Sequence, residues 1–333
     1  MIKNQKMLFV CGAPRSGTTA MHALLTADKR IVMGMERYEG YLNDELGPQL
    51  FSKERFFNFE SDPRDSKKSL PYYADIAAPC FETSEYIGDK IPLLYQQFGR
   101  VIKAFPEAKF VVLLRNIIDI CNSYQNLQDD PNHDWSFDVH DAVNHWNQLL
   151  EFIKLHGSDP RIKLVVYEDF YTLGIERYKD LYAFLNLELD DVLVQGYRKT
   201  LEITQHLEQK RKTVLHDVQK LAIYKKANFE LYQSILNKGI ASSNPTATEM
   251  KTVTNDKNSI ALGEADIASA FRIFMGRTQV SKTELDGFAS LDGIDLMARI
   301  FSSSEFQSNA FNRELITSLA AKIRDQLAKT KPS

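Results

Sequence analysis

The chain has 333 residues, of which 44% are hydrophobic and 26% are charged, so it can bury a large core and hold one sizeable domain beside a smaller one. Its 41 basic and 44 acidic residues leave a net charge of −3, which excludes a general attraction to nucleic acid or acidic membranes. The three cysteines, Cys11, Cys80 and Cys121, indicate neither a disulfide framework nor a zinc site, and they favour a reducing, cytoplasmic location.

The N-terminal segment predicts a strand, a loop and a helix. The apolar run Met7–Cys11 is about five residues long, too short for a signal-peptide core or a membrane span. The loop Gly12-Ala-Pro-Arg-Ser-Gly-Thr-Thr19 follows, and Met21, Leu24 and Leu25 then share one helical face. Two glycines five residues apart let backbone N–H groups converge at a helix N-terminus, which predicts an anion site.

This loop has the spacing of the nucleotide-triphosphate motif G-x-x-x-x-G-K-[ST], but Thr18 stands where that motif has lysine. Arg15 instead brings a cation earlier in the loop. The loop therefore suits a donor with a shorter charged group than a triphosphate.

Residues 28–90 have weak periodicity and many aromatic side chains, so we expect a helical and irregular cover over the site, where an acceptor would bind. Two helix–strand units follow. The first runs from Leu94 to a strand at Lys109–Arg115, and the second from a helix after Asp141 to a strand at Lys163–Tyr167. Buried strands separated by helices predict an α/β fold with a parallel sheet covered on both faces, similar to P-loop NTPases, and a ligand site at the carboxyl ends of the strands.

The pattern from Tyr178 to Leu187 and from Leu201 to Leu236 is helical, and the run Lys210-Arg-Lys212 fits a solvated helical face. A polar stretch then separates a second helical pattern. We expect a main domain at residues 1–240, a linker at 241–260 and a small helical C-terminal module at 261–333.

The sequence Pro14-Arg-Ser-Gly-Thr-Thr19 resembles the 5′-phosphosulfate loop of sulfotransferases that use 3′-phosphoadenosine 5′-phosphosulfate (PAPS). It is closest to the bacterial and tyrosylprotein-type branch, and the resemblance covers about residues 7 to 236. It implies PAPS as co-substrate, no metal, and in-line transfer of a sulfuryl group to a hydroxyl or amine. The donor-binding residues that it implies in the loop are Arg15, Ser16, Gly17, Thr18 and Thr19.

Arg115 and Ser123, eight residues apart, resemble the family's second motif, which binds the 3′-phosphate of the donor. The planar guanidinium of arginine suits a phosphate dianion. Ile117 departs from the proline that is usual there. Tyr167-Glu-Asp169 resembles a family segment whose tyrosine lies near the adenine of the donor.

Three residues carry the chemistry that the resemblance implies. Lys90, in Asp89-Lys-Ile-Pro92, resembles the family's lysine that stabilises the bridging oxygen, with Arg15 as its partner. Glu36 lies where the tyrosylprotein-type branch has its catalytic glutamate, and an ionised carboxylate can accept the acceptor's proton. Other candidates for the base are Glu39 and a histidine, among His22, His133, His140 and His145.

Two further enzyme or binding classes stay open: a P-loop kinase or nucleotide hydrolase, and a non-catalytic glycan- or partner-binding protein with a vestigial donor site. The phrases Phe271–Arg277 and Ser303–Phe306 resemble a helical module appended to bacterial glycosyl- and sulfotransferases, although a stabilising helical cap explains them equally well. We expect a small-molecule, carbohydrate or peptide acceptor and neither nucleic acid nor a membrane span. The oligomeric state is left open.

Overall fold

The computed structural model describes residues 5–132, 136–172, 174–210, 215, 217–242 and 282. The chain divides into two compact units, Met1–Asn244 and Pro245–Ser333. The predicted C-terminal module, apart from Lys282, and most of the predicted linker lie outside the described residues, as do Arg211, Lys212 and His133. The fold and the candidate site described below therefore lie in the first unit.

Within the described residues, five parallel strands form one sheet in the order β2-β3-β1-β4-β5. Their bounds are β1 Lys6–Gly12, β2 Ile31–Met35, β3 Tyr86–Lys90, β4 Lys109–Leu114 and β5 Ile162–Val166. The three predicted strands are β1, β4 and β5, and the register places Val10 beside both Lys90 and Val111. The carboxyl ends of the strands, which carry the predicted site residues, thus meet at one edge.

The prediction that residues 28–90 form only a helical and irregular cover is wrong, because this segment also supplies β2 and β3. Both strands are short and contain glycine, which hides the apolar pattern of a buried strand. Gly88 is required by packing, since a Cβ atom there would lie 1.6 Å from the carbonyl oxygen of Leu8 in β1. Tertiary contact between strands, not local propensity, forms this half of the sheet.

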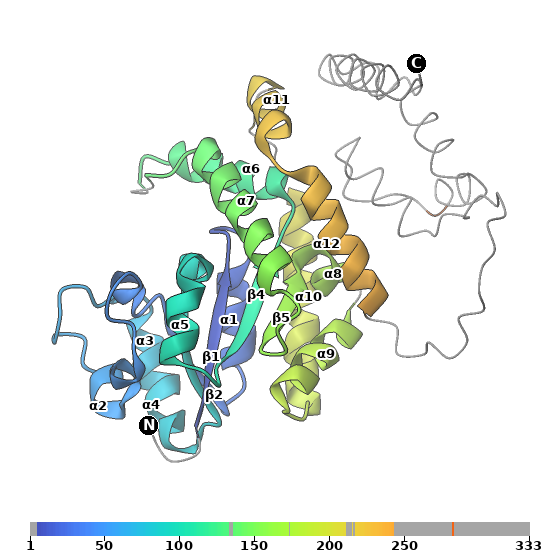
Figure 1. The fold of residues 1–333 in the computed structure, drawn as a ribbon. Coiled ribbons are helices and arrows are strands. Elements are labelled where there is room, and N and C mark those ends of the chain that lie inside the picture. The colour runs from blue at the N-terminus through green and yellow to red at the C-terminus, as the bar shows by residue number, and fades with distance from the viewer. Residues whose placement is uncertain are drawn as a thin grey trace, which may run out of the picture. The chain divides into compact units, whose positions relative to one another are not determined.

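Helices cover both faces of the sheet, as predicted (Figure 1). Phe9 and Cys11 of β1 belong to one buried cluster, whereas Leu8 and Val10 belong to the other. The first cluster includes residues of α5 Phe98–Ala104, α6 Ile117–Gln128, α7 Val139–His156, α11 Asp217–Lys226 and α12 Phe229–Ser242. The second includes residues of α1 Thr18–Thr26, α8 Tyr167–Thr172, α9 Ile175–Leu185 and α10 Asp191–Lys210.

Three predicted boundaries need correction. Helix α7 begins at Val139 rather than after Asp141, because Asp138 is its N-cap and Asp141 completes the capping box. Tyr167 does not close a strand but begins α8 directly after β5. The helical stretch predicted from Leu201 begins earlier, because α10 starts at Asp191, and it is divided among α10, α11 and α12.

Short helices between β2 and β3 pack against the sheet edge. They are η1 Glu39–Tyr41, η2 Pro48–Phe51, α2 Lys53–Phe56, α3 Leu70–Tyr72, the π-helix η3 Tyr73–Ala77, α4 Ala78–Cys80 and η4 Phe81–Thr83; η5 Pro92–Gln97 follows β3. The edge strand β2 donates from Met33 N to the Tyr72 hydroxyl at 3.1 Å and from Met35 N to the Tyr73 hydroxyl at 2.9 Å. These bonds satisfy backbone groups that an edge strand would otherwise expose, and they fasten the cover to the sheet.

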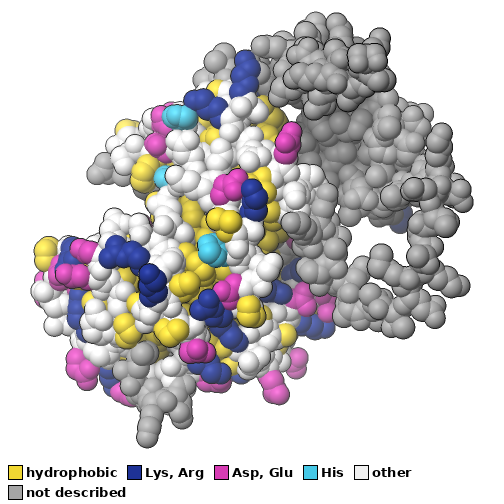
Figure 2. All heavy atoms as spheres, in the orientation of Figure 1, with side chains coloured by type: hydrophobic (Ala, Val, Ile, Leu, Met, Phe, Trp, Pro, Cys, Tyr) yellow, Lys and Arg dark blue, Asp and Glu magenta, His cyan; other side chains and the backbone are white. Residues whose placement is uncertain are grey.

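Lysine and arginine side chains are interspersed with acidic ones over the face drawn in Figure 2, in keeping with a net charge of −3. Among the helices in the described residues, none has the length and apolar character needed to cross a membrane.

Candidate active site

The loop between β1 and α1 has the geometry of an anion cradle. Ser16 N donates to the carbonyl of Ala13 at 3.0 Å, and Gly17, in the left-handed region at φ 100°, precedes the first residue of α1. Among the residues that the structure describes, no side chain caps α1. Its first-turn N–H groups therefore remain available to an anion, which the helix dipole also favours.

Both glycines of the loop are required by close approach. A Cβ atom on Gly12 would lie 2.5 Å from the carbonyl oxygen of Leu113, and one on Gly17 would lie 2.7 Å from the ring of Tyr167. Arg15 also adopts a positive φ of 70°, which is uncommon for a residue other than glycine. The tight turn is thus held by the neighbouring β4 and α8.

Ser16 lies at the centre of this loop and is fully buried. Among the described residues, its Oγ atom has no hydrogen-bond partner. A buried hydroxyl without a partner costs free energy unless a ligand or water satisfies it. This observation fits a phosphate or sulfate group in the cradle.

The second predicted motif lies directly against the loop. Arg115 follows β4, is 4% exposed, and donates from Nη1 to the carbonyl of Arg15 at 3.4 Å. Its guanidinium lies 3.9 Å from the ring centroid of Tyr167. The buried Trp146 donates from Nε1 to the Arg115 carbonyl at 2.9 Å, which fixes the backbone at this point.

The departure at Ile117 leaves the helix start intact. Asn116 is the N-cap of α6, and its side chain accepts from Ile118 N at 2.8 Å. Ile117 is then the first residue of the helix, a position that proline favours but does not have to occupy.

Arg15 and Ser123 join the two motifs. The Nε atom of Arg15 donates to the Ser123 Oγ atom at 2.9 Å across 108 positions of sequence. The structure therefore brings together the loop residues, Arg115, Ser123 and Tyr167, as the sequence predicted. The Arg15 side chain points to Ser123.

A second cluster centres on Glu36, which follows β2. Lys90, at the end of β3, is 1% exposed and places its Nζ atom 2.5 Å from Glu36 Oε1 and 3.4 Å from the Thr19 hydroxyl. Lys68, from the segment before α3, contacts Glu36 Oε2. One carboxylate thus holds two ammonium groups, beside the first turn of α1.

The charge of Glu36 is set by these neighbours. Burial opposes ionisation, but the ammonium groups of Lys90 and Lys68 outweigh it and hold the pKa of Glu36 below its ordinary value. Glu36 is therefore ionised at neutral pH, the state that a general base requires.

Asp89 holds the turn that carries Glu36. It is fully buried, and its carboxylate accepts from Arg37 N at 3.1 Å and from Tyr38 N at 2.8 Å. Burial raises the pKa of Asp89 to about 7, although the two N–H donors favour the charged form. Glu36 itself has a positive φ of 54°, and its N–H donates to the Lys90 carbonyl at 2.9 Å. The turn is thus fixed from both strands.

The alternative bases lie in different surroundings. Glu39 lies in η1, where partial burial of its carboxyl together with the Glu36 charge raises its pKa. His22 is 3% exposed, and burial lowers its pKa to about 4, so its imidazole is neutral at pH 7. His140 and His145 lie on α7. Glu36 alone of these candidates contacts Lys90 in the described part of the chain.

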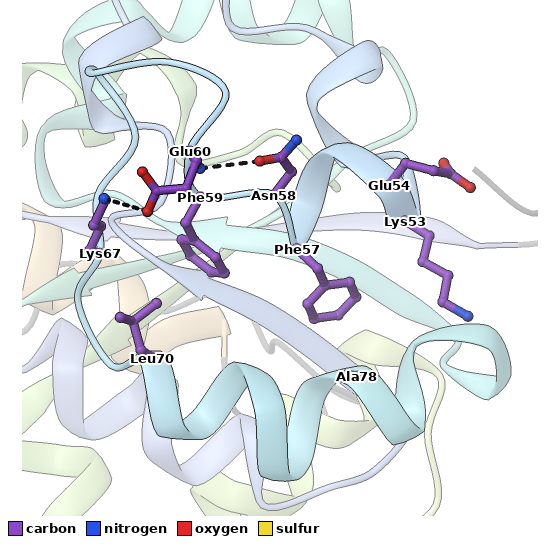
Figure 3. Close-up of a pocket in the computed structure, with 9 residues that line it drawn as sticks. All are labelled: Lys53, Glu54, Phe57, Asn58, Phe59, Glu60, Lys67, Leu70 and Ala78. Atoms are coloured by element: carbon purple, nitrogen blue, oxygen red, sulfur yellow. Dashed lines mark hydrogen bonds and ion pairs between the residues drawn. The ribbon is translucent and has the colours of Figure 1, made fainter.

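An open groove of about 960 Å³ lies in the chain segment that connects β2 to β3 (Figure 3). The rings of Phe57 and Phe59 face the helix that begins at Leu70 and continues past Ala78. Lys67 pairs with Glu60 at its rim at 2.7 Å. Aromatic and aliphatic carbon therefore lines a concave surface within the segment expected to bind an acceptor.

These features define a class: an α/β protein of the P-loop type in which a glycine turn, a helix N-terminus and the Arg115 guanidinium lie together. The chain belongs to the sulfotransferase family, whose family model matches residues 8–191. This confirms the family expected from the two motifs.

The chain is also similar to individual proteins. It is 24% identical over 250 residues to an uncharacterized protein of Aquifex aeolicus (strain VF5), covering 67% of this chain and 31% of that protein. It is 23% identical over 209 residues to protein-tyrosine sulfotransferase 1 of Danio rerio, covering 58% of this chain and 56% of that protein. A solved sulfotransferase from Mycobacterium avium is 12% identical, with a TM-score of 0.41 over 72% of this chain and 77% of its own. The chain thus spans about a third of the length of the Aquifex aeolicus protein and about half of the length of the Danio rerio protein.

Sequence reasoning missed three residues that shape the site. Lys68 lies in an irregular segment with no motif, Asp89 was noted only as the neighbour of Lys90, and Trp146 was assigned only to a helix face. Asp89 lies in β3, where all five residues are buried, and no local signal identifies Lys68 as a partner of Glu36.

Proposed function

We propose that this protein transfers a sulfuryl group from PAPS to a hydroxyl or amine of an acceptor. The observation that supports it best is the direct contact of Arg115 with the Arg15 carbonyl, joined by the Arg15–Ser123 bond, which unites the two anion-binding motifs. The loop from Arg15 to Thr19 would bind the 5′-phosphosulfate, while Arg115 and Ser123 would bind the 3′-phosphate. The ring of Tyr167 would support the Arg115 guanidinium beside the nucleotide.

In the reaction, the acceptor oxygen attacks sulfur while the bond from sulfur to the bridging phosphate oxygen breaks in line. The acceptor proton passes to Glu36. Lys90, with Arg15 as a second cation, would balance the charge that develops on the leaving 3′-phosphoadenosine 5′-phosphate (PAP). The Lys90 ammonium group must then leave the Glu36 carboxylate and contact the leaving oxygen. Because the carboxylate loses a positive neighbour, it becomes a stronger proton acceptor as transfer begins.

The proposed acceptor is tested with three classes of compound. Similarity to a protein-tyrosine sulfotransferase supports testing tyrosine peptides, and the aromatic groove supports testing phenols; carbohydrates complete the panel. The decisive experiment is transfer of labelled sulfate from PAPS to this panel, read by mass spectrometry. Formation of a sulfated product would support the proposal; donor binding without product in any class would favour a non-catalytic protein.

A kinase or nucleotide hydrolase is the less favoured enzyme class. Position 18, which carries the phosphate-binding lysine in such enzymes, is a threonine that is 4% exposed. Magnesium-dependent ATP binding tighter than PAP binding would support that class instead.

Arg115→Ala is expected to weaken PAP binding about 100-fold, because two charge-assisted hydrogen bonds to one phosphate contribute roughly 3 kcal/mol. Isothermal titration calorimetry with PAP measures this directly. Arg100→Ala is the matched control, since Arg100 is exposed on α5 and donates to the Asp44 carbonyl. Unchanged affinity in Arg115→Ala would contradict the donor site.

Lys90→Met is expected to lower kcat by about 10²- to 10³-fold, the usual effect of removing one group that stabilises developing negative charge. Affinity for PAPS should change much less, because negative charge develops on the bridging oxygen only as its bond to sulfur breaks. Lys109→Met is the control, since Lys109 begins β4 at the opposite end of the sheet. A loss in kcat of less than tenfold would exclude Lys90 from this role.

A further inference from the structure

The Glu36 carboxylate has one buried and one exposed ammonium partner. The Lys90 side chain, on Oε1, is 1% exposed, whereas the Lys68 side chain, on Oε2, is 59% exposed. An acceptor that comes from solvent cannot reach Oε1 without displacing a buried lysine. It can reach Oε2 by displacing Lys68.

The backbone near Lys68 presents its side chain to Glu36. Ser66 N donates to the Arg37 carbonyl at 3.2 Å, which ties this segment to the residue that follows Glu36. Ser69 adopts a left-handed φ of 61° immediately before α3, a conformation uncommon for serine. The segment is thus fixed on both sides of Lys68.

The same segment borders the aromatic groove. Lys67 and Leu70, on either side of Lys68, both line it (Figure 3). A molecule seated in the groove would therefore touch the segment that places Lys68 on the carboxylate.

We propose that Lys68 is an exchangeable cap on the catalytic base, which occupies Glu36 Oε2 until the acceptor hydroxyl takes its place. This inference rests on the proposed function. In the exchange the Lys68–Glu36 contact breaks, and the acceptor O–H donates to Oε2. On transfer the proton moves to that oxygen, the new oxygen–sulfur bond forms and the bond to PAP breaks. Lys68 is a positioning residue, since it acts through Glu36.

The cap also alters the basicity of Glu36. The charged or titratable groups that act on Glu36 are Lys90 and Asp89 of β3, Lys68, Glu39 of η1 and His22 of α1. Lys68 lowers the pKa of Glu36, so its release raises that pKa when the acceptor binds.

The first test needs no acceptor: titration of the Glu36 carboxyl by carbon-13 NMR in the full chain, with assignment by Glu36→Gln. Lys68→Met should shift the Glu36 titration to higher pH, and Lys68→Arg should restore it. Lys154→Met is the control, because Lys154 is 55% exposed and also pairs with a glutamate, Glu151. A Glu36 titration unchanged in Lys68→Met would overturn the proposal.

The second test uses the hydroxyl compound of the acceptor panel that gives the most product. Lys68→Met should lower the KM for this compound about two- to fivefold, the range that loss of an exposed ion pair allows. It should also move the acidic limb of the kcat/KM profile to higher pH. Affinity for PAP should not change. A raised KM would show that the acceptor uses Lys68 for binding and would overturn the proposed exchange. Absence of any product would count against the proposed function, and the NMR titration of Glu36 would then still test whether Lys68 caps the carboxylate.

Discussion

Glu36→Gln is expected to lower kcat by about 10²- to 10⁴-fold, the range that a general base supplies. The amide keeps the size of the side chain but cannot accept the acceptor proton. Affinity for PAP should be retained, because Glu36 lies with Lys90 and Lys68 rather than with Arg115. Rates with the best acceptor of the panel and calorimetry with PAP measure the two quantities.

The pH profile sharpens this test. Because Lys90 and Lys68 hold the pKa of Glu36 below its ordinary value, the base stays ionised throughout the neutral range. We therefore expect a wild-type kcat/KM, which reports the free enzyme, that is level near neutrality and falls only in acid, and loss of this acidic limb in Glu36→Gln. Glu85→Gln, at the amino end of β3, is the inert control. A large loss in Glu39→Gln with little loss in Glu36→Gln would reassign the base.

Asp65→Asn is expected to lower the free energy of unfolding by about 3–5 kcal/mol, because it leaves a buried arginine without its charge partner. The Asp65 carboxylate accepts from Arg37 at 3.0 Å, from Arg55 at 2.6 and 2.8 Å, and from the Tyr41 hydroxyl at 2.9 Å. Arg37 and Asp65 are both fully buried at the side chain. Arg55 could turn toward solvent, but Arg37 is held against the ring of Phe59 at 4.1 Å. Urea unfolding at pH 7 measures the loss.

The effect should depend on pH with a defined sign. Burial opposes ionisation, but hydrogen bonds from Arg55 and Arg37 dominate and hold the pKa of Asp65 below its ordinary value. The stabilisation is therefore complete above about pH 4, the ordinary range of an aspartate, and is lost as pH falls through the lower, folded-state pKa. The difference between wild type and Asp65→Asn should shrink accordingly in acid.

The control for Asp65 is Asp62→Asn, which breaks a more exposed pair with Arg64 at 2.8 Å. Pairs at the surface contribute little, so its unfolding curve should stay close to wild type. Equal, small effects of both substitutions would show that Asp65 does not hold the cover in place.

Much of this fold was predictable because its signals are local. The apolar runs of β1, β4 and β5, the glycine spacing of the loop and the helical face of α1 need only neighbouring residues. The proposed donor motifs are recognised by residue type and spacing, so Arg115 and Ser123 could be predicted as donor-binding residues before any distance was known. Strands β2 and β3 could not, because Gly34 and Gly88 interrupt their apolar pattern and only pairing with neighbouring strands makes them strands.

By itself, the sequence determined the parallel α/β class and the family, and it predicted the residues of an anion site, because these depend on periodicity and on short motifs. Tertiary structure alone decided what each charged group meets. It placed Lys68 and Lys90 on the two oxygens of Glu36, Trp146 on the backbone of Arg115, and Asp65 between two arginines. The physical reason is that charge and hydrogen bonding act through space, whereas sequence pattern reports only which face of its own element a residue occupies.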